Sequence, residues 1–104
     1  MYKSGDVILA QVQFTDTFEI KKRPALILYH EHNNIIVAGI TSNQKMTGIT
    51  LSKTEGAIKD SIIKTNYLFT ISEVMIERIL FHLNKTKKEI VYNDLVRRFK
   101  SLIE

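Results

Sequence analysis

Two short polar segments of the chain carry side chains that could bind an anion. Arg23 follows two lysines and precedes the only proline, and Thr41-Ser42 follow the apolar run IIVAGI. A guanidinium group offers forked donors to two phosphate oxygens and stays charged, and a threonine hydroxyl adds a further donor. On residue types alone, Arg23 also suits a surface ion pair, and Thr41-Ser42 also suit the end of a strand. The segments can act together only if the fold brings them together.

The elements around these segments have the sequence patterns of β-strands. Residues 6–14 alternate apolar and polar types, which predicts a strand with one face in the core. Residues 15–22 are polar and resemble a turn, and Pro24 then biases Arg23 towards an extended backbone. Residues 25–29 and 35–40 are apolar and rich in Leu, Ile and Val, which predicts two further strands.

A hairpin is predicted between the second and third of these strands. The polar segment HEHNN separates them, and Asn33-Asn34 can adopt the positive φ of a tight turn. Pairing about this turn would place Leu26 opposite Thr41. Arg23 and Thr41 would therefore lie at the same end of one sheet.

The rest of the chain predicts a small barrel followed by a helix. Residues 48–51 and 61–71 are expected to be short strands, joined by a polar loop in which Gly56 supplies the turn. Ser72-Glu73 could open a brief helix, because serine can cap the first turn and glutamate suits the positive end of the helix dipole. Short strands without long helices between them are typical of a small antiparallel barrel.

A longer helix is predicted at the C-terminal end. Thr86 and Glu89 have the spacing of a capping box. An apolar stripe at helical spacing then follows on one face, and it consists of Val91, Leu95, Phe99, Leu102 and Ile103. The opposite face carries most of the basic residues of this segment.

Composition excludes several classes of protein. The 104 residues suffice for one core, so residues 1–104 are expected to form a single domain. With no cysteine and three scattered histidines, thiolate zinc sites and cysteine nucleophiles are excluded, and we expect chemistry without a metal or other cofactor. No apolar run approaches the length of a membrane span, and the N-terminus lacks the apolar region of a signal peptide, so a soluble cytoplasmic protein is expected. The net charge of +4 suits a polyanionic partner.

Four segments of the chain form a recognisable series, and they are GDVILAQVQFTD (5–16), KKRPALIL (21–28), IIVAGITSNQ (35–44) and KDSIIKTNYLFTIS (59–72). In this order they resemble the PemK/MazF family of toxin endoribonucleases from type II toxin–antitoxin systems. The resemblance implies a mainly β fold, an SH3-like barrel with a C-terminal α-helix. It also implies a homodimer that cleaves single-stranded RNA without a cofactor and is inhibited by a cognate antitoxin, with operator DNA contacted only through that antitoxin.

The resemblance also assigns roles to single residues. The catalytic arginine of the family's RP motif falls on Arg23, and the threonine of its ITS motif falls on Thr41. Where some members keep a basic and an acidic functional residue, this chain has Lys64 and Asn66. Asn66 can hydrogen-bond a base or a ribose but is a poor proton acceptor. The residues expected to bind RNA are Ser42, Lys64, Asn66, Phe14, Thr15 and Lys22.

The chemistry implied is attack of an RNA 2′-hydroxyl on the adjacent phosphorus, which gives a 2′,3′-cyclic phosphate and a 5′-hydroxyl. Because the pKa of a guanidinium group exceeds about 12, Arg23 is assigned to stabilising charge on the phosphoryl oxygens, and the general base is left unnamed. Two alternatives remain open. One is a catalytically degraded module that binds RNA or antitoxin, which Asn66 favours. The other is a DNA gyrase inhibitor of the same fold, against which the RP and ITS motifs argue.

Overall fold

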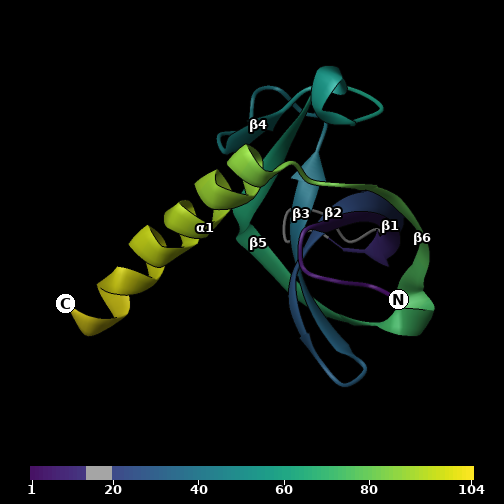
Figure 1. The fold of residues 1–104 in the computed structure, drawn as a ribbon, viewed down its shortest axis with the longest axis horizontal. Helices are drawn as coiled ribbons and strands as arrows, with labels where there is room; N and C mark the ends of the chain where they lie inside the picture. The colour runs from purple at the N-terminus through teal and green to yellow at the C-terminus, as the bar shows by residue number, and fades with distance from the viewer. Residues whose placement is uncertain (14–19) are drawn as a thin grey trace.

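Six β-strands and one long α-helix build the protein in a computed structural model, which describes residues 1–13 and 20–104 (Figure 1). The strands are β1 (Asp6–Val12), β2 (Lys21–Glu31), β3 (Asn34–Thr41), β4 (Ile49–Leu51), β5 (Ser61–Ser72) and β6 (Ile76–His82). The helix is α1 (Lys85–Phe99), and the 3-10 helices are η1 (Lys53–Glu55), η2 (Glu73–Met75) and η3 (Lys100–Ile103). Within these described ranges, no helix is long and apolar enough to cross a membrane.

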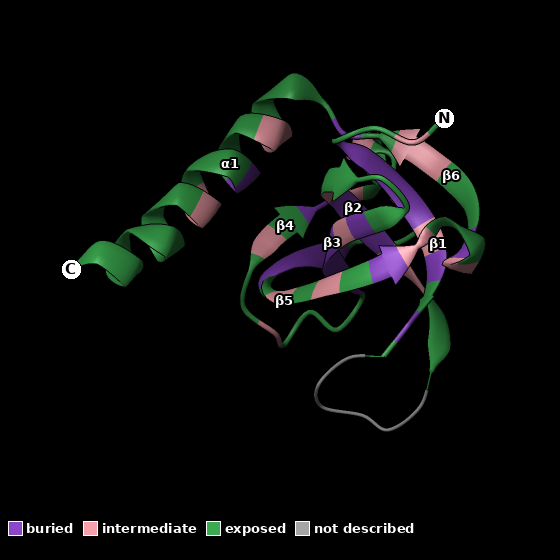
Figure 2. Cartoon of the chain, turned by 90° about the horizontal axis from the view of Figure 1, so that it is seen from below, coloured by how far each residue is buried: buried purple, intermediate pink, exposed green. Residues whose placement is uncertain are grey.

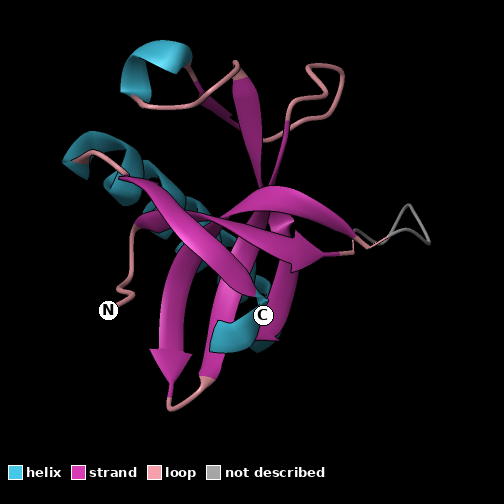
Figure 3. Ribbon diagram, turned by 90° about the vertical axis from the view of Figure 1, so that its right-hand side faces the viewer, coloured by secondary structure: helices cyan, strands magenta, loops and turns pink. Residues whose placement is uncertain are grey.

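The strands form one antiparallel sheet in the order β4-β5-β3-β2-β1-β6. The sheet is strongly curled, so that its strands cross one another at steep angles and enclose a common interior (Figure 3). The result is a half-barrel with a C-terminal helix, and it confirms the mainly β fold expected from the sequence.

Both faces of the central strands are buried, which explains their continuous apolar sequences. On β2, Ala25 and Ile27 belong to one core cluster, whereas Leu26 between them belongs to a second. The second cluster is completed by α1, which contributes the buried Val91 and the partly buried Leu95. Figure 2 shows the consequence: the central strands are largely buried, whereas the far end of α1 is exposed.

The β2–β3 turn lies one residue earlier than predicted. Glu31 pairs with Asn34, so the turn residues are His32 and Asn33, and His32 takes the positive φ of 54° that was assigned to asparagine. A register shift between Ile27 and Tyr29 changes the pairing further. Leu26 therefore lies opposite Ala38 and not opposite Thr41. Turn position and bulge depend on contacts across the sheet, which the local sequence pattern does not contain.

Other boundaries also differ from the expected ones. Strand β2 begins at Lys21, inside the segment predicted to be a turn, and strand β6 was not predicted at all, because most of its residues are exposed and lack apolar alternation. Helix α1 starts after Asn84, whose side chain accepts a hydrogen bond from the Lys87 amide at 2.8 Å. Thr86 is therefore inside the first turn, and the predicted Thr86–Glu89 capping box is wrong.

Candidate functional site

A groove of about 520 Å³ opens at the end of the sheet where β2 begins and β3 ends. This end lies opposite the β2–β3 hairpin tip (Figure 1). Its polar lining consists of Lys21, Lys22, Arg23, Thr41, Ser42, Lys59 and Ser61. Apolar side chains complete it, and they are Val7, Leu9, Pro24, Ile40, Leu51, Ala57, Ile58, Leu80 and Phe81.

Strand pairing places Arg23 and Thr41 at this groove. The last paired residues of β2 and β3 are Ala25 and Gly39, and Arg23 and Thr41 each lie two positions beyond them. Pro24 has no amide hydrogen to donate, and the ladder between the two strands ends beside it. The prediction that Arg23 and Thr41 share one end of the sheet is therefore confirmed, although the predicted register was wrong.

The Thr41 side chain is held in a fixed orientation. It is only 7% exposed, and its Oγ1 accepts a hydrogen bond of 3.1 Å from the Asn43 amide. A hydroxyl group can accept and donate at the same time. The hydroxyl hydrogen of Thr41 can thus be donated to an acceptor in the groove while the Asn43 contact fixes the oxygen.

The electrostatics of the groove favour an anion. Among the described residues that line it, four are cationic and none is acidic. One of the cations, Lys22, is bound to Glu77 on β6, with 2.5 Å between Nζ and Oε1. The hydrogen bond from Lys22 keeps the pKa of Glu77 below its usual value. Lys22 is thus shared between the groove and β6, and Lys21, Lys22 and Lys59 are all exposed.

Lys64 and Asn66 do not line this groove. Lys64 is 7% exposed, and its Nζ donates to the Thr47 carbonyl oxygen at 2.5 Å and lies 5.3 Å from the centre of the Tyr67 ring. Strand β5 changes register between Lys64, which faces Gly39, and Leu68. Within this irregular segment Lys64 is buried whereas Asn66 is exposed, so the two side chains do not share one surface of the strand.

The remaining expected RNA contacts are divided between the groove and the part of the chain that is not described. Ser42 and Lys22 line the groove, whereas Phe14 and Thr15 lie outside the described residues. Sequence reasoning missed Lys59, Ser61, Ile58 and Phe81, which the fold brings to the same groove. The local signal for two of them was a lysine and a serine, Lys59 and Ser61, at the entry to the strand predicted over residues 61–71, and Ile58 and Phe81 had none.

Two solved structures are similar to this chain over most of its length. The first is the Mycobacterium tuberculosis toxin MazF-mt6, with a TM-score of 0.74, 22% identity, and coverage of 91% of this chain and 96% of that chain. The second is an endoribonuclease in complex with its cognate antitoxin from a mycobacterial species, with a TM-score of 0.71, 9% identity and 93% of both chains covered. At these identities the similarity establishes the fold.

The family itself is established from the sequence. No curated sequence relative matches the chain. The family profile that matches describes the PemK-like, MazF-like toxins of type II toxin–antitoxin systems, and it covers residues 3–99. Because this match spans nearly the whole chain, the protein belongs to the PemK-like, MazF-like toxin family of type II toxin–antitoxin systems.

Proposed function

We propose that this toxin is a cytoplasmic endoribonuclease that cleaves single-stranded RNA without a metal. The observation that carries the proposal is the convergence of Arg23 and Thr41 on one cationic groove. A phosphodiester is anionic and needs donors that stabilise further negative charge during cleavage. The groove offers a guanidinium group and an oriented hydroxyl for this purpose.

The reaction begins with attack of a 2′-hydroxyl on the adjacent phosphorus. The 5′-oxygen of the next nucleotide leaves, which gives a 2′,3′-cyclic phosphate and a 5′-hydroxyl. Arg23 binds two phosphoryl oxygens, and Thr41 donates to one of them. Among the described residues that line the groove there is no histidine or carboxylate. Their contribution is therefore positioning of the phosphate and stabilisation of its charge, and not removal of the proton.

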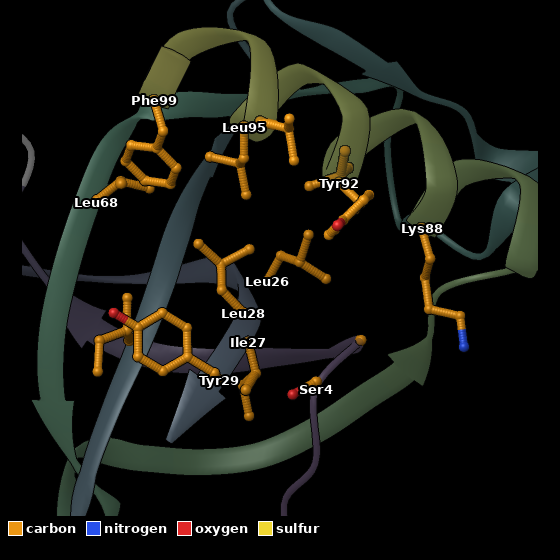
Figure 4. Close-up of a pocket in the computed structure, with 14 residues that line it drawn as sticks. Ser4, Leu26, Ile27, Leu28, Tyr29, Leu68, Lys88, Tyr92, Leu95 and Phe99 are labelled. Carbon is orange, nitrogen blue, oxygen red and sulfur yellow. The ribbon is translucent and has the colours of Figure 1, made fainter. Parts of the chain in front are cut away.

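The proposal includes a homodimer formed over a second, apolar groove. This groove, of about 570 Å³, lies between α1 and β2, and Leu26 and Leu28 face Leu95 and Tyr92 across it (Figure 4). Among the described residues that line it, the polar side-chain groups belong to Ser4, Lys88 and two tyrosines, Tyr29 and Tyr92. Such a surface suits an apolar protein partner better than RNA. A second copy would cover it with the same exposed helix face.

An antitoxin is the second protein partner proposed. One of the similar solved structures is an endoribonuclease bound to its cognate antitoxin. The cationic groove of this chain would attract an acidic antitoxin segment by the same charges that attract RNA. Operator DNA would be reached through that antitoxin.

The decisive test is cleavage of a long, mixed-sequence single-stranded RNA in the presence of EDTA. We expect discrete cuts with cyclic phosphate ends from the wild type and none from Arg23→Ala. Arg78→Ala is the matched control, because Arg78 is an exposed arginine of β6 that does not line the groove. Intact RNA from folded wild-type protein would contradict the proposal and favour a non-enzymatic binding module.

A further inference from the structure

The loop between β4 and β5 (residues 52–60) is fastened along its length by hydrogen bonds. Glu55 Oε1 accepts from the Ser52 amide at 2.8 Å, which closes a capping box around η1. Asp60 ties the other end, because its Oδ1 accepts from the Lys53 amide at 3.0 Å and its carbonyl accepts from Gln44 Nε2 at 2.7 Å. Hydrogen bonds at both ends give the loop a defined shape.

The loop also contacts the sheet and the helix. Lys87 of α1 donates to the Thr50 carbonyl at 2.6 Å and lies 3.3 Å from Glu55 Oε2. Gly56 has a φ of +119°, and a Cβ atom at this position would lie 2.6 Å from Phe81 Cδ2. Only glycine fits such a contact without displacement, so the loop backbone rests directly on the Phe81 ring.

This fixed loop presents an exposed apolar side chain at the groove. Ile58 is 72% exposed, yet it lines the same groove as Arg23 and Thr41. Lys59 follows it, also exposed and also in the lining. A single exposed isoleucine is unremarkable on a surface. Its position matters here because the hydrogen-bonded loop places it in the lining of a groove that Phe81 and four cations also border.

We infer that residues 57–59 form the nucleotide-binding wall of the active site. An unpaired base next to the cleaved bond packs on Ile58 and Phe81, and the phosphate on its far side binds Lys59. The inference rests on the proposed ribonuclease function and adds to it the surface that selects the base. Loop shape then decides which base fits, since the isoleucine contact itself distinguishes bases only by size and shape.

The composition of the groove favours a nucleotide over other occupants. A nucleotide combines an apolar base face with a charged phosphate. The wall offers a matching pair of consecutive residues, the apolar Ile58 and the cationic Lys59. An acidic peptide would use the cations but not the apolar surface. An apolar peptide would bury the exposed cation Lys59 without bringing a group of opposite charge to it, which is unfavourable.

The first experiment compares cleavage patterns of Ile58→Ala and the wild type on a mixed-sequence single-stranded RNA. The substitution removes three carbon atoms of the apolar contact with the base, so we expect KM to rise about 5- to 30-fold with little change in kcat. The base preference at one position beside the cut should relax. Val74→Ala is the matched control, because Val74 is 89% exposed and lies on η2 outside the groove.

The second experiment separates the base contact from the phosphate contact. Lys59→Gln should raise KM equally for all sequences and reduce the slope of log affinity against log salt by about 0.7, because one phosphate contact to a single strand is lost. Lys100→Gln is its control, since Lys100 follows α1 and does not line the groove. A change in base preference without a change in salt dependence would overturn the role of Lys59.

The outcomes distinguish this inference from the function on which it rests. If the wild type cleaves RNA and Ile58→Ala keeps the cut pattern and KM of Val74→Ala, the base-binding wall is wrong and the ribonuclease function stands. If the folded wild type leaves RNA intact, the ribonuclease function is wrong. Fluorescence anisotropy with the same RNA then tests the wall alone, and equal affinity of wild type and Ile58→Ala would overturn it.

Discussion

Arg23 and Thr41 occupy equivalent places on two neighbouring antiparallel strands, each two residues beyond the last pair formed by Ala25 and Gly39. Both side chains line the same cationic groove. A register shift of one residue on either strand would turn one of them to the opposite face of the sheet. The alignment of β2 and β3 is therefore the structural condition for the proposed active site.

Replacing Thr41 tests the hydroxyl donor. Thr41→Val keeps the shape but cannot donate to a phosphoryl oxygen, and loss of one such donor lowers kcat by about 100-fold. Thr41→Ser retains the hydroxyl and should retain most of the activity. Single-turnover cleavage of RNA measures both variants. Equal rates for the valine and serine variants would remove Thr41 from the mechanism.

Lys64 is expected to stabilise the fold. Its buried ammonium group donates to the Thr47 carbonyl, so Lys64→Ala removes both this bond and buried side-chain packing. We expect a loss of about 1–3 kcal/mol in the free energy of unfolding, measured by urea denaturation. Exposed Lys45, in the segment between β3 and β4, provides the control Lys45→Ala. Unchanged stability together with weaker RNA binding would instead support the RNA contact predicted from the sequence.

Asp94 makes stability depend on pH. Hydrogen bonds from Thr65, and then from Arg97 and Arg98, lower the pKa of Asp94 from 3.8 to about 2. Because the folded pKa lies below the unfolded one, the carboxylate stabilises the fold above the unfolded pKa, and this contribution is lost as the pH falls through the folded pKa of about 2.

The corresponding variant is Asp94→Asn. At neutral pH it should unfold with a free energy lower by about 1–2 kcal/mol. Its stability should also change less with pH in the acid range than that of the wild type. Urea denaturation at several acid pH values measures both effects. Parallel stability curves for the two proteins would show that Asp94 does not carry the acid dependence.

Gly56→Ala tests the contact between the loop and Phe81. The added Cβ combines a close approach to the ring with an unfavourable positive φ, so the loop must move. We expect a loss of about 1–3 kcal/mol in unfolding free energy and weaker RNA cleavage, because Ile58 moves with the loop. Wild-type stability and wild-type cleavage in this variant would show that the loop geometry is unimportant.

The apolar groove predicts the oligomeric state. Phe99 lines it and is 58% exposed, so Phe99→Glu should convert the proposed homodimer into a folded monomer. Leu102→Glu is the control, because Leu102 is more exposed and lies outside the groove. Light scattering after size-exclusion chromatography measures the mass. A monomeric wild type, or equal effects of both substitutions, would contradict an interface at this groove.

The strand positions were largely predictable, and the exact pairing was not. Apolar runs marked β2 and β3, because strands covered on both faces must exclude polar side chains. Strand β6 escaped prediction since its outer residues are exposed and its position depends on pairing with β1. Thr86 and Glu89 had the right spacing for a cap, but the structure uses Asn84, where the chain enters the helix from Leu83 in the core.

By itself, the sequence determined the family, the predominance of strands and the candidate pair Arg23 and Thr41, because these depend on local residue types and motif order. Only the tertiary structure decided that Lys64 is buried and that Ile58 and Lys59 border the groove. Residues far apart in the chain meet through strand pairing and loop anchoring. Those contacts are set by the packing of the whole sheet, and no local pattern of side chains contains them.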